Sequence, residues 1–148
     1  MKRGILVIAT LLLSFTAMAQ HTREVTLFGH RGSRYEFDEN TMAAYKGMRE
    51  KGVNGLETDV RLTKDGELVI SHDSSLDRLT PNAGKVEEMT RKQISKVTTD
   101  KGNPIAFVDE LCLWLSECNG MYVEFEMKTG DYSPEQLKSY CTKLYKMA

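Results

Sequence analysis

The stretch GLETDVRLTKDGELVISHD, residues 55–73, contains two short apolar segments separated by a turn signal. The segments Leu56–Leu62 and Leu68–Ser71 each have the length of a typical strand. Lys64-Asp65-Gly66 lies between them and favours a tight turn. The stretch therefore predicts two consecutive strands, the first of which is unusually polar for a buried strand.

Strand and helix signals alternate before and after this stretch. The apolar segment Val25–Gly29 predicts a strand, and Asn40-Thr41 predicts the start of a helix that runs to about Lys51. The later elements are predicted, in chain order, as a helix over 108–117, a strand over 121–127 and a helix that opens with Ser133-Pro134. Strands that alternate with helices favour a parallel sheet with covering helices.

Residues 73–101 depart from this alternation. They are polar and rich in turn signals, and Thr90-Arg91-Lys92-Gln93 predicts one short capped helix among them. We interpret this segment as an inserted lobe. A (β/α)8 barrel needs about 250 residues, whereas about 129 follow residue 19. The expected fold class is therefore α/β, either a small open sheet or a truncated TIM-type barrel with a lobe after its second strand pair.

The first residues have the layout of a secretory signal peptide. Lys2 and Arg3 precede the apolar run Ile5–Phe15, and small residues follow at Ala17 and Ala19. We expect cleavage after Ala19, so that 1–19 is removed and 24–148 forms the exported domain. A membrane anchor is the alternative, but the apolar run is short for a bilayer of about 30 Å. No later segment is long and apolar enough to span a membrane.

Composition excludes some classes of partner. The 148 residues carry a formal net charge of -1, which provides no basic field for nucleic acid. The three cysteines, Cys112, Cys118 and Cys141, lack the spacing of a zinc site. Because their number is odd, we expect them to be buried small apolar side chains rather than a disulfide framework.

Acidic residues lie where buried strands should be apolar. Alternation places Glu57 and Asp59 on one face of their strand and groups Glu124, Glu126 and Lys128 on one face of the strand over 121–127. Carboxylates that face a sheet interior repel one another unless a cation lies between them. Oxygen ligands of this kind suit Ca2+ or Mg2+. The alternative is that both strands have one solvated face.

Two histidines stand at the ends of predicted strands. His30 follows Leu27-Phe28-Gly29, and His72 follows Val69-Ile70-Ser71. Sites in parallel α/β folds assemble at the carboxyl ends of strands, and imidazole suits proton exchange near neutral pH. Arg31 follows His30, and its planar guanidinium suits a pair of phosphate oxygens. His21 has no such setting, and we expect it to be inert.

These residues occur in an ordered series that resembles the glycerophosphodiester phosphodiesterase family. The series runs over most of the chain after residue 24 and consists of His30-Arg31-Gly32, Glu39-Asn40-Thr41, Gly55–Val60, Thr63–Gly66, His72-Asp73, Leu76–Thr80, Gly84 and Glu126-Met127-Lys128. Each motif alone is weak, but their order and spacing are specific. The sequence departs from the family at Ala106-Phe107, where Pro and Thr commonly open a helix, and at the additional acid Glu124.

The resemblance implies a TIM-type barrel and a role for each site residue. It implies that Glu57, Asp59 and Glu126 hold a divalent cation and that His30 and His72 act as general acid and base. Arg31 would grip phosphate, and Lys128 would neutralise developing charge. Asn40 and Thr41 would be helix-capping residues.

The expected reaction is metal-dependent hydrolysis of a glycerophosphodiester to glycerol phosphate and an alcohol, with a small-molecule substrate and no nucleic acid. Resemblance to related enzymes favours the neighbouring glycerol hydroxyl as nucleophile, which would give a cyclic phosphate first, while direct attack by water is the alternative. Two other functions remain open. One is a secreted ligand-binding fragment without turnover, and the other is a related phosphodiesterase that acts on phospholipids such as sphingomyelin.

Overall fold

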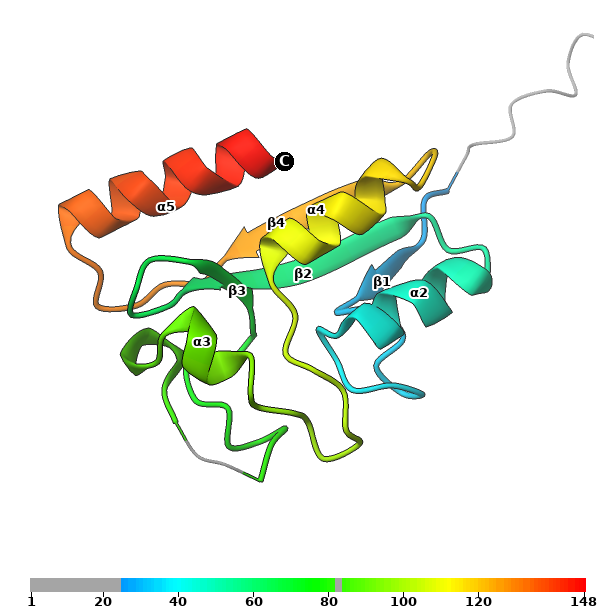
Figure 1. The fold of residues 1–148 in the computed structure, drawn as a ribbon. Helices are drawn as coiled ribbons and strands as arrows, with labels where there is room; N and C mark the ends of the chain where they lie inside the picture. The colour runs from blue at the N-terminus through cyan, green and yellow to red at the C-terminus, as the bar shows by residue number, and fades with distance from the viewer. Residues whose placement is uncertain (1–24, 82–83) are drawn as a thin grey trace, which may run out of the picture.

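The computed structural model describes residues 25–81 and 84–148. Its centre is a four-stranded sheet of β1 (Phe28–His30), β2 (Gly55–Leu62), β3 (Leu68–Ile70) and β4 (Tyr122–Met127). The strand β2 lies in the middle and runs beside β4 along most of its length (Figure 1). The α/β class agrees with the prediction. The first strand begins later than predicted, at Phe28, and the preceding Val25 and Leu27 are 78% and 63% exposed.

The sheet is mixed, which corrects the prediction of a parallel sheet. Both β1 and β4 pair with β2 in parallel, whereas β3 pairs with it antiparallel, with Val60 opposite Ile70 and Leu62 opposite Leu68. The connection between β2 and β3 is a tight turn with Gly66 at φ 78°. A turn of this length joins only antiparallel strands, since a parallel pair needs a crossover of a dozen or more residues.

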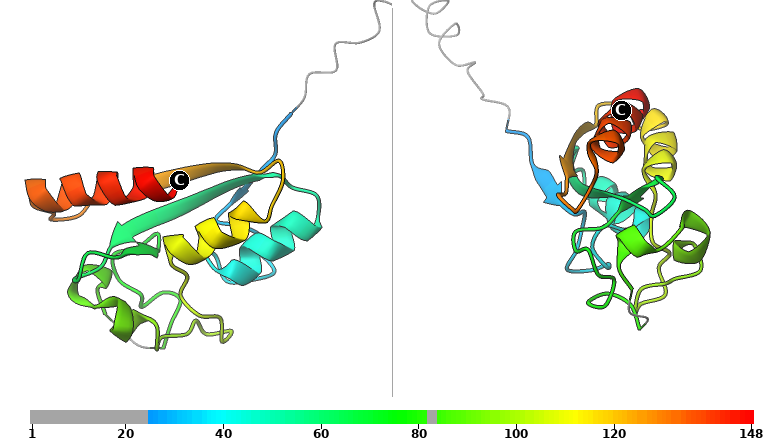
Figure 2. Two further views of the ribbon diagram at one scale, coloured as in Figure 1. Left: turned by 45° about the horizontal axis from the view of Figure 1, so that its top comes forward. Right: turned by 90° about the vertical axis from the view of Figure 1, so that its left-hand side faces the viewer.

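Helices cover the apolar face of the sheet. They are α2 (Met42–Glu50), α4 (Val108–Ser116) and α5 (Pro134–Met147), and α5 packs beside α4. Figure 2 shows α2 and α4 on the same side of the strands. Leu56 and Val60 of β2 are fully buried in one cluster with Tyr45 of α2, Leu111 of α4 and Tyr140 of α5. The alternate residues Glu57 and Asp59 therefore face the other side of the sheet.

Local signals explain where the helices begin. The hydroxyl of Thr41 accepts a hydrogen bond from the backbone N of Ala44 at 3.2 Å, as a capping residue should. Phe107 cannot cap α4 with its own side chain, and instead its backbone N donates to Oε2 of Glu110 at 3.3 Å. The helix therefore begins at the predicted place although the usual capping residue is missing.

Residues 71–81 and 84–106 form a small lobe at one end of the sheet (Figures 1 and 2). The lobe contains a short 3-10 turn, η1 (Val86–Glu88), and the one-turn helix α3 (Arg91–Ile94), whose predicted capping box between Thr90 and Gln93 is present. A second hydrophobic cluster joins Val86 and Ile94 of the lobe to Val69 of β3 and to Phe107. The lobe thus packs on a second apolar centre that it shares with the end of the sheet.

Two expectations concern features outside the core. All three cysteines are free, but Cys141 is exposed rather than buried, because it lies on the outer side of α5, while Cys112 and Cys118 are partly buried. Within the described ranges, none of the helices combines the length and the apolar character that a bilayer crossing requires. The predicted signal peptide, residues 1–19, lies outside the described residues.

Candidate active site

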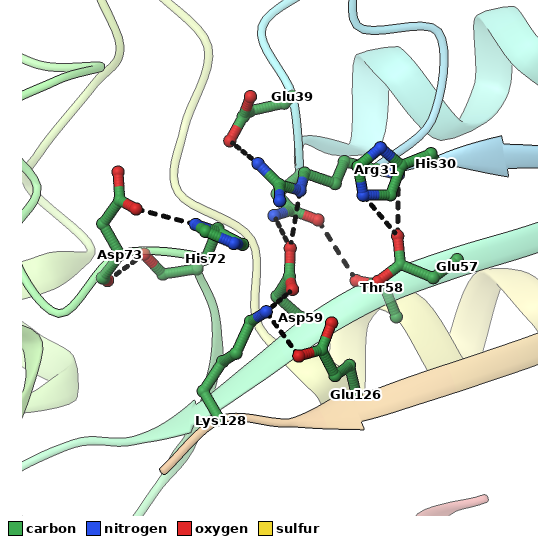
Figure 3. A network of polar contacts seen from close by, with 12 residues as sticks. His30, Arg31, Glu39, Glu57, Thr58, Asp59, His72, Asp73, Glu126 and Lys128 are labelled. Carbon is green, nitrogen blue, oxygen red and sulfur yellow. Dashed lines mark hydrogen bonds and ion pairs between the residues drawn. The ribbon is translucent and has the colours of Figure 1, made fainter. Parts of the chain in front are cut away.

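Three carboxylates from two neighbouring strands converge on one point of the uncovered sheet face. The parallel register sets Asp59 of β2 opposite Glu126 of β4, and Glu57 lies two residues before Asp59 on the same side. One oxygen from each carboxylate lies within 4.8 Å of the others. Figure 3 shows Asp59 and Glu126 facing the same space from adjacent strands. The structure therefore brings together the three acids that the sequence singled out.

The oxygen atoms of this group suit a hard cation. Oε1 of Glu57 is buried and accepts no hydrogen bond from any described residue, and the buried Oδ1 of Asp59 faces Nζ of Lys128 at 2.8 Å. Burial raises the pKa of Glu57, and the negative charge of Asp59 raises it further. Uncompensated carboxylate oxygens in a buried position are costly unless a positive charge neutralises them. Their number and chemistry fit Ca2+ or Mg2+, both of which prefer oxygen ligands.

Lys128 supplies one such positive charge. Its Nζ lies 2.8 Å from Oδ1 of Asp59 and donates to Oε1 of Glu126 at 2.6 Å. Burial alone would lower the pKa of Lys128, but these two carboxylates outweigh burial and raise it. Burial alone would likewise raise the pKa of Asp59, yet Lys128 and the amide of Asn40 hold it below its usual range. Glu124, on the same strand, is exposed and lies outside the acid group.

Arg31 enters the site because the backbone turns sharply after β1. Arg31 has φ 60°, and Gly32 follows at φ 79°, where an added Cβ would lie 2.8 Å from Ala44. The backbone N of Arg31 donates to Oε2 of Glu57 at 3.1 Å, and its Nη1 donates to Oε1 of Glu39 at 3.0 Å. Its Nε forms an ion pair with Asp59 at 3.1 Å. The guanidinium is thus held beside the acid group.

The two imidazoles come from opposite directions. His30, at the end of β1, places Nε2 3.7 Å from Oε2 of Glu57, and its side chain is 54% exposed. His72 follows β3, and its Nδ1 lies 2.7 Å from Oδ1 of Asp73. The prediction that His72 reaches the site from the end of a parallel strand is wrong. The antiparallel β3 instead carries the chain back toward Asp59, whose carbonyl accepts a hydrogen bond from Ser71 N at 3.0 Å.

A buried polar network behind Asp59 was not predicted from the sequence. Nδ2 of Asn40 donates to Oδ2 of Asp59 at 2.8 Å, and the hydroxyl of Tyr45 donates to Oδ1 of Asn40 at 3.1 Å. The same hydroxyl lies 2.7 Å from Oγ1 of Thr58. Asn40 therefore orients Asp59, while the capping role belongs to Thr41 alone. The sequence feature that could have indicated this network is Thr58, a polar residue at an apolar-face position of β2.

Arg61 extends the polar face by one more alternate position of β2. Its Nε and Nη2 donate to the carbonyl of His72 at 3.1 and 2.9 Å, and its Nη1 donates to Oε1 of Glu87 at 2.8 Å. The guanidinium therefore ties the histidine backbone to η1 of the lobe. Alternation along β2 places Arg61 on the same face as Glu57 and Asp59, and this was the signal that could have identified it.

Both the sequence and the fold of this chain are similar to those of known proteins. Residues 30–145 match the model of the glycerophosphoryl diester phosphodiesterase family. A glycerophosphodiester phosphodiesterase of Caldanaerobacter subterraneus subsp. tengcongensis is 45% identical over 71 residues, which are 48% of this chain and 29% of that protein. The structure of a glycerophosphodiester phosphodiesterase from Agrobacterium tumefaciens has a TM-score of 0.69 at 27% identity, covering 82% of this chain and 54% of the other.

A third similar protein was solved with a bound product. This phosphodiesterase of Oleispira antarctica, in complex with the product sn-glycerol-3-phosphate, has a TM-score of 0.73 at 25% identity, covering 82% of this chain and 52% of the other. The present chain spans about half the length of these solved structures. Because the family model covers the chain from His30 to Tyr145, the chain belongs to the glycerophosphoryl diester phosphodiesterase family.

Proposed function

We propose that the chain carries the catalytic site of a metal-dependent glycerophosphodiester phosphodiesterase, which hydrolyses a glycerophosphodiester to glycerol phosphate and an alcohol. One observation carries the proposal: three carboxylates lie within 4.8 Å of one another, and Oε1 of Glu57 among them is buried without a hydrogen bond from the described residues. Family membership supports the reaction class, and the product bound to the Oleispira antarctica relative supports the substrate class.

The proposed cation is held by Glu57, Asp59 and Glu126. When bound, a divalent cation supplies Lewis-acid stabilisation of charge on a phosphoryl oxygen. Ca2+ and Mg2+ both suit the oxygen ligands. A phosphodiester carries one negative charge. Arg31 and Lys128 are positively charged and lie beside the three carboxylates, where each contacts Asp59. These two residues would therefore bind the nonbridging phosphate oxygens and stabilise the transition state.

The two histidines are the proposed proton carriers. One imidazole accepts the proton of the attacking oxygen, and the other donates a proton to the alkoxide as the P–O bond to the alcohol breaks. We propose the neighbouring glycerol hydroxyl as the attacking group, so that a cyclic phosphate forms before water opens it. The positions of the two histidines support separate roles as acid and base. His30 ends β1 and His72 follows β3, and Asp59 lies between them in Figure 3.

Metal binding can be tested without substrate. Isothermal titration with Ca2+, Mg2+ and Mn2+ should show one site in the wild-type chain, and Asp59→Asn or Glu126→Gln should weaken it at least tenfold. Glu124→Gln is the matched control, since Glu124 lies on the same strand but outside the acid group. Equal binding by Glu126→Gln and Glu124→Gln would contradict the proposed ligand set.

Activity is tested with glycerophosphocholine. We expect release of glycerol phosphate that requires the metal and falls by roughly 100-fold or more in His30→Ala and His72→Ala, because general acid–base catalysis contributes about 100- to 10,000-fold. Hydrolysis that persists with a chelator and in His30→Ala would refute the mechanism. Turnover of sphingomyelin in preference to glycerophosphocholine would instead favour the phospholipid-directed alternative.

The proposal extends to fold and location. We propose that β1, β2 and β4 are consecutive parallel strands of a (β/α)8 barrel and that the segment over 73–101 is an insertion in it. We also propose that the protein is exported after cleavage behind Ala19. A second candidate function is a ligand-binding module that does not turn over. Metal binding without hydrolysis would support that candidate.

A further inference from the structure

A continuous series of charged contacts connects His72 to Arg31. Nδ1 of His72 lies 2.7 Å from Oδ1 of Asp73, and Oδ2 of Asp73 accepts a hydrogen bond from Nε of Arg78 at 2.6 Å. Nη2 of Arg78 donates to Oε1 of Glu39 at 2.6 Å, and the same oxygen accepts from Nη1 of Arg31 at 3.0 Å. Asp73, Arg78 and Glu39 have no part in the reaction proposed above.

The contact with Asp73 decides which nitrogen of His72 carries the proton. Hydrogen bonds from His72 and Arg78 outweigh the effect of burial and hold the pKa of Asp73 below its usual range. An ionised carboxylate only accepts hydrogen bonds, so Nδ1 of His72 must be the donor. The lone pair of a neutral ring then lies on Nε2. In Figure 3 the ring of His72 stands between Asp73 and Asp59, with this second nitrogen on the Asp59 side.

Arg78 holds Asp73 in the position that this contact needs. The side chain of Asp73 is 36% exposed and would rotate into solvent if nothing fixed it. The guanidinium of Arg78 binds Asp73 with Nε and the buried Glu39 with Nη2, and a planar fork of this kind fixes both partners in one plane. Burial alone would raise the pKa of Glu39, but Arg78 and Arg31 outweigh it and keep Glu39 charged.

A purely structural role for Arg78 would be to dock the lobe, but the lobe has another anchor. Nδ2 of Asn103 donates to Oδ2 of Asp38 at 3.0 Å, and the hydroxyl of Thr99 donates to the same oxygen. Asp38 lies in the segment before α2, so this contact joins the lobe to the main body without Arg78. Removing Arg78 should therefore release Asp73 while the lobe stays in place.

We propose that Arg78 is a positioning residue, which holds Asp73 so that His72 keeps its proton on Nδ1 and presents Nε2 to the substrate. The orienting role of Asp73 follows the logic by which an aspartate fixes the tautomer of a catalytic histidine in hydrolytic triads. The value of this arrangement for catalysis rests on the proposed function, whereas the tautomer itself does not depend on turnover.

The tautomer can be measured directly in the full chain. Long-range 1H–15N correlation spectra distinguish a protonated from an unprotonated ring nitrogen, and a His72→Gln spectrum assigns the signals of His72 among the three histidines. At a pH where the ring is neutral, we expect Nδ1 to be protonated and Nε2 unprotonated. A neutral His72 with its proton on Nε2 would overturn the proposal.

Three variants then test the role of Arg78. Asp73→Asn, whose amide can donate to Nδ1, should shift the ring toward the Nε2–H form, and Arg78→Gln should give a mixture of both forms. Arg78→Lys keeps the charge without the fork and should lie between Arg78→Gln and the wild type. If folded Arg78→Gln and Arg78→Lys both keep the wild-type 15N shifts of His72, Arg78 does not position the ring.

Arg91→Gln is the matched control. Arg91 is also an arginine of the lobe that pairs with carboxylates, Asp109 and Glu110, but none of its contacts reaches His72. This variant should keep the tautomer of the wild type. With glycerophosphocholine, Arg78→Gln should lower kcat roughly tenfold or more with little change in KM, because the group that it misplaces transfers a proton. An inactive wild-type chain whose His72 still shows Nδ1–H would support the positioning role and contradict the proposed function.

Discussion

The ammonium nitrogen of Lys128 lies 2.8 Å from Oδ1 of Asp59, a residue that is completely buried. The side chain of Lys128 is itself only 13% exposed. Together with Arg31, which forms an ion pair with Oδ2 of Asp59 at 3.1 Å, Lys128 therefore balances the buried negative charge of Asp59. Lys128 and the proposed cation would share the carboxylates of Asp59 and Glu126, so the stability of the chain and its affinity for metal should be coupled.

Replacing Lys128 should make folding depend on metal. Lys128→Met leaves the buried Asp59 with Arg31 as its remaining ion-pair partner, and losing one partner of a buried ion pair costs up to about 3 kcal/mol. Ca2+ or Mn2+ at 100 times its dissociation constant should return about 2.7 kcal/mol. Urea unfolding with and without metal measures both effects. Lys138→Met, at an exposed position of α5, is the control, and an equal loss of stability in both variants would contradict the coupling.

Asn40 should contribute to stability in two separable ways. It has φ 58°, and its amide donates to Asp59. Asn40→Gly keeps the left-handed backbone without strain but loses the hydrogen bonds, at a cost of about 1–3 kcal/mol. Asn40→Ala loses the hydrogen bonds and adds strain of about 1 kcal/mol. Thermal unfolding should therefore rank the wild type above the glycine variant and the glycine variant above the alanine variant.

An alanine variant that is as stable as the glycine variant would show that the backbone at Asn40 relaxes. Weakened metal binding in both variants is also expected, since each removes the donor that orients Asp59. Metal affinity typically falls about 10- to 100-fold when a supporting hydrogen bond to a ligand is lost.

The sequence predicted the elements whose signals are local. Thr41 and the Thr90–Gln93 pair cap helices where their side chains meet backbone groups within three residues. The alternation of Glu57 and Asp59 along β2 likewise depends only on the strand period. These features could be predicted because the interactions that determine them join residues only a few positions apart.

The features that escaped prediction depend on contacts between distant residues. Arg78 meets Glu39 across 39 positions of sequence, and no local pattern indicates that pairing. The route of His72 into the site depends on the antiparallel direction of β3, which follows from the tight turn rather than from the strand itself. The place of Asn40 was mistaken because asparagine favours both caps and left-handed positions.

Asp38 should make the anchor of the lobe sensitive to acid. Burial alone would raise the pKa of Asp38, but hydrogen bonds from Thr99 and Asn103 outweigh it and hold the pKa below the ordinary value of 3.8. The contribution of Asp38 to the free energy of unfolding is therefore fully present above pH 3.8 and is lost as pH falls through the lower pKa of the folded state. Asp38→Asn should flatten the fall in stability between about pH 4 and the acid limit.

Urea unfolding of the wild type and Asp38→Asn from pH 6 to pH 3 measures this difference. Asp77→Asn, at an exposed position of the lobe, controls for the general effect of losing an acid. Parallel stability curves for the wild type and Asp38→Asn would contradict the role of Asp38.

Glu57 should stabilise metal binding at the expense of the metal-free fold. Burial and the charge of Asp59 raise its pKa, so ionisation of Glu57 costs free energy in the folded state. The stability of the fold therefore falls as pH rises from the pKa of the unfolded state toward the raised pKa of the folded state.

Glu57→Gln removes this cost and keeps an oxygen that can accept a hydrogen bond from the backbone N of Arg31, which donates to Glu57 at 3.1 Å. Without metal at pH 7, the variant should be more stable than the wild type by about 0.5–2 kcal/mol, as when a strained functional site is relieved. The advantage should disappear near pH 3, well below the ordinary pKa of glutamate, where the carboxyl is protonated in both states, and it should reverse when saturating metal stabilises only the wild type. A metal-free variant that is less stable than the wild type at pH 7 would mean that Glu57 is held by its hydrogen bond with Arg31 more strongly than it is repelled by Asp59.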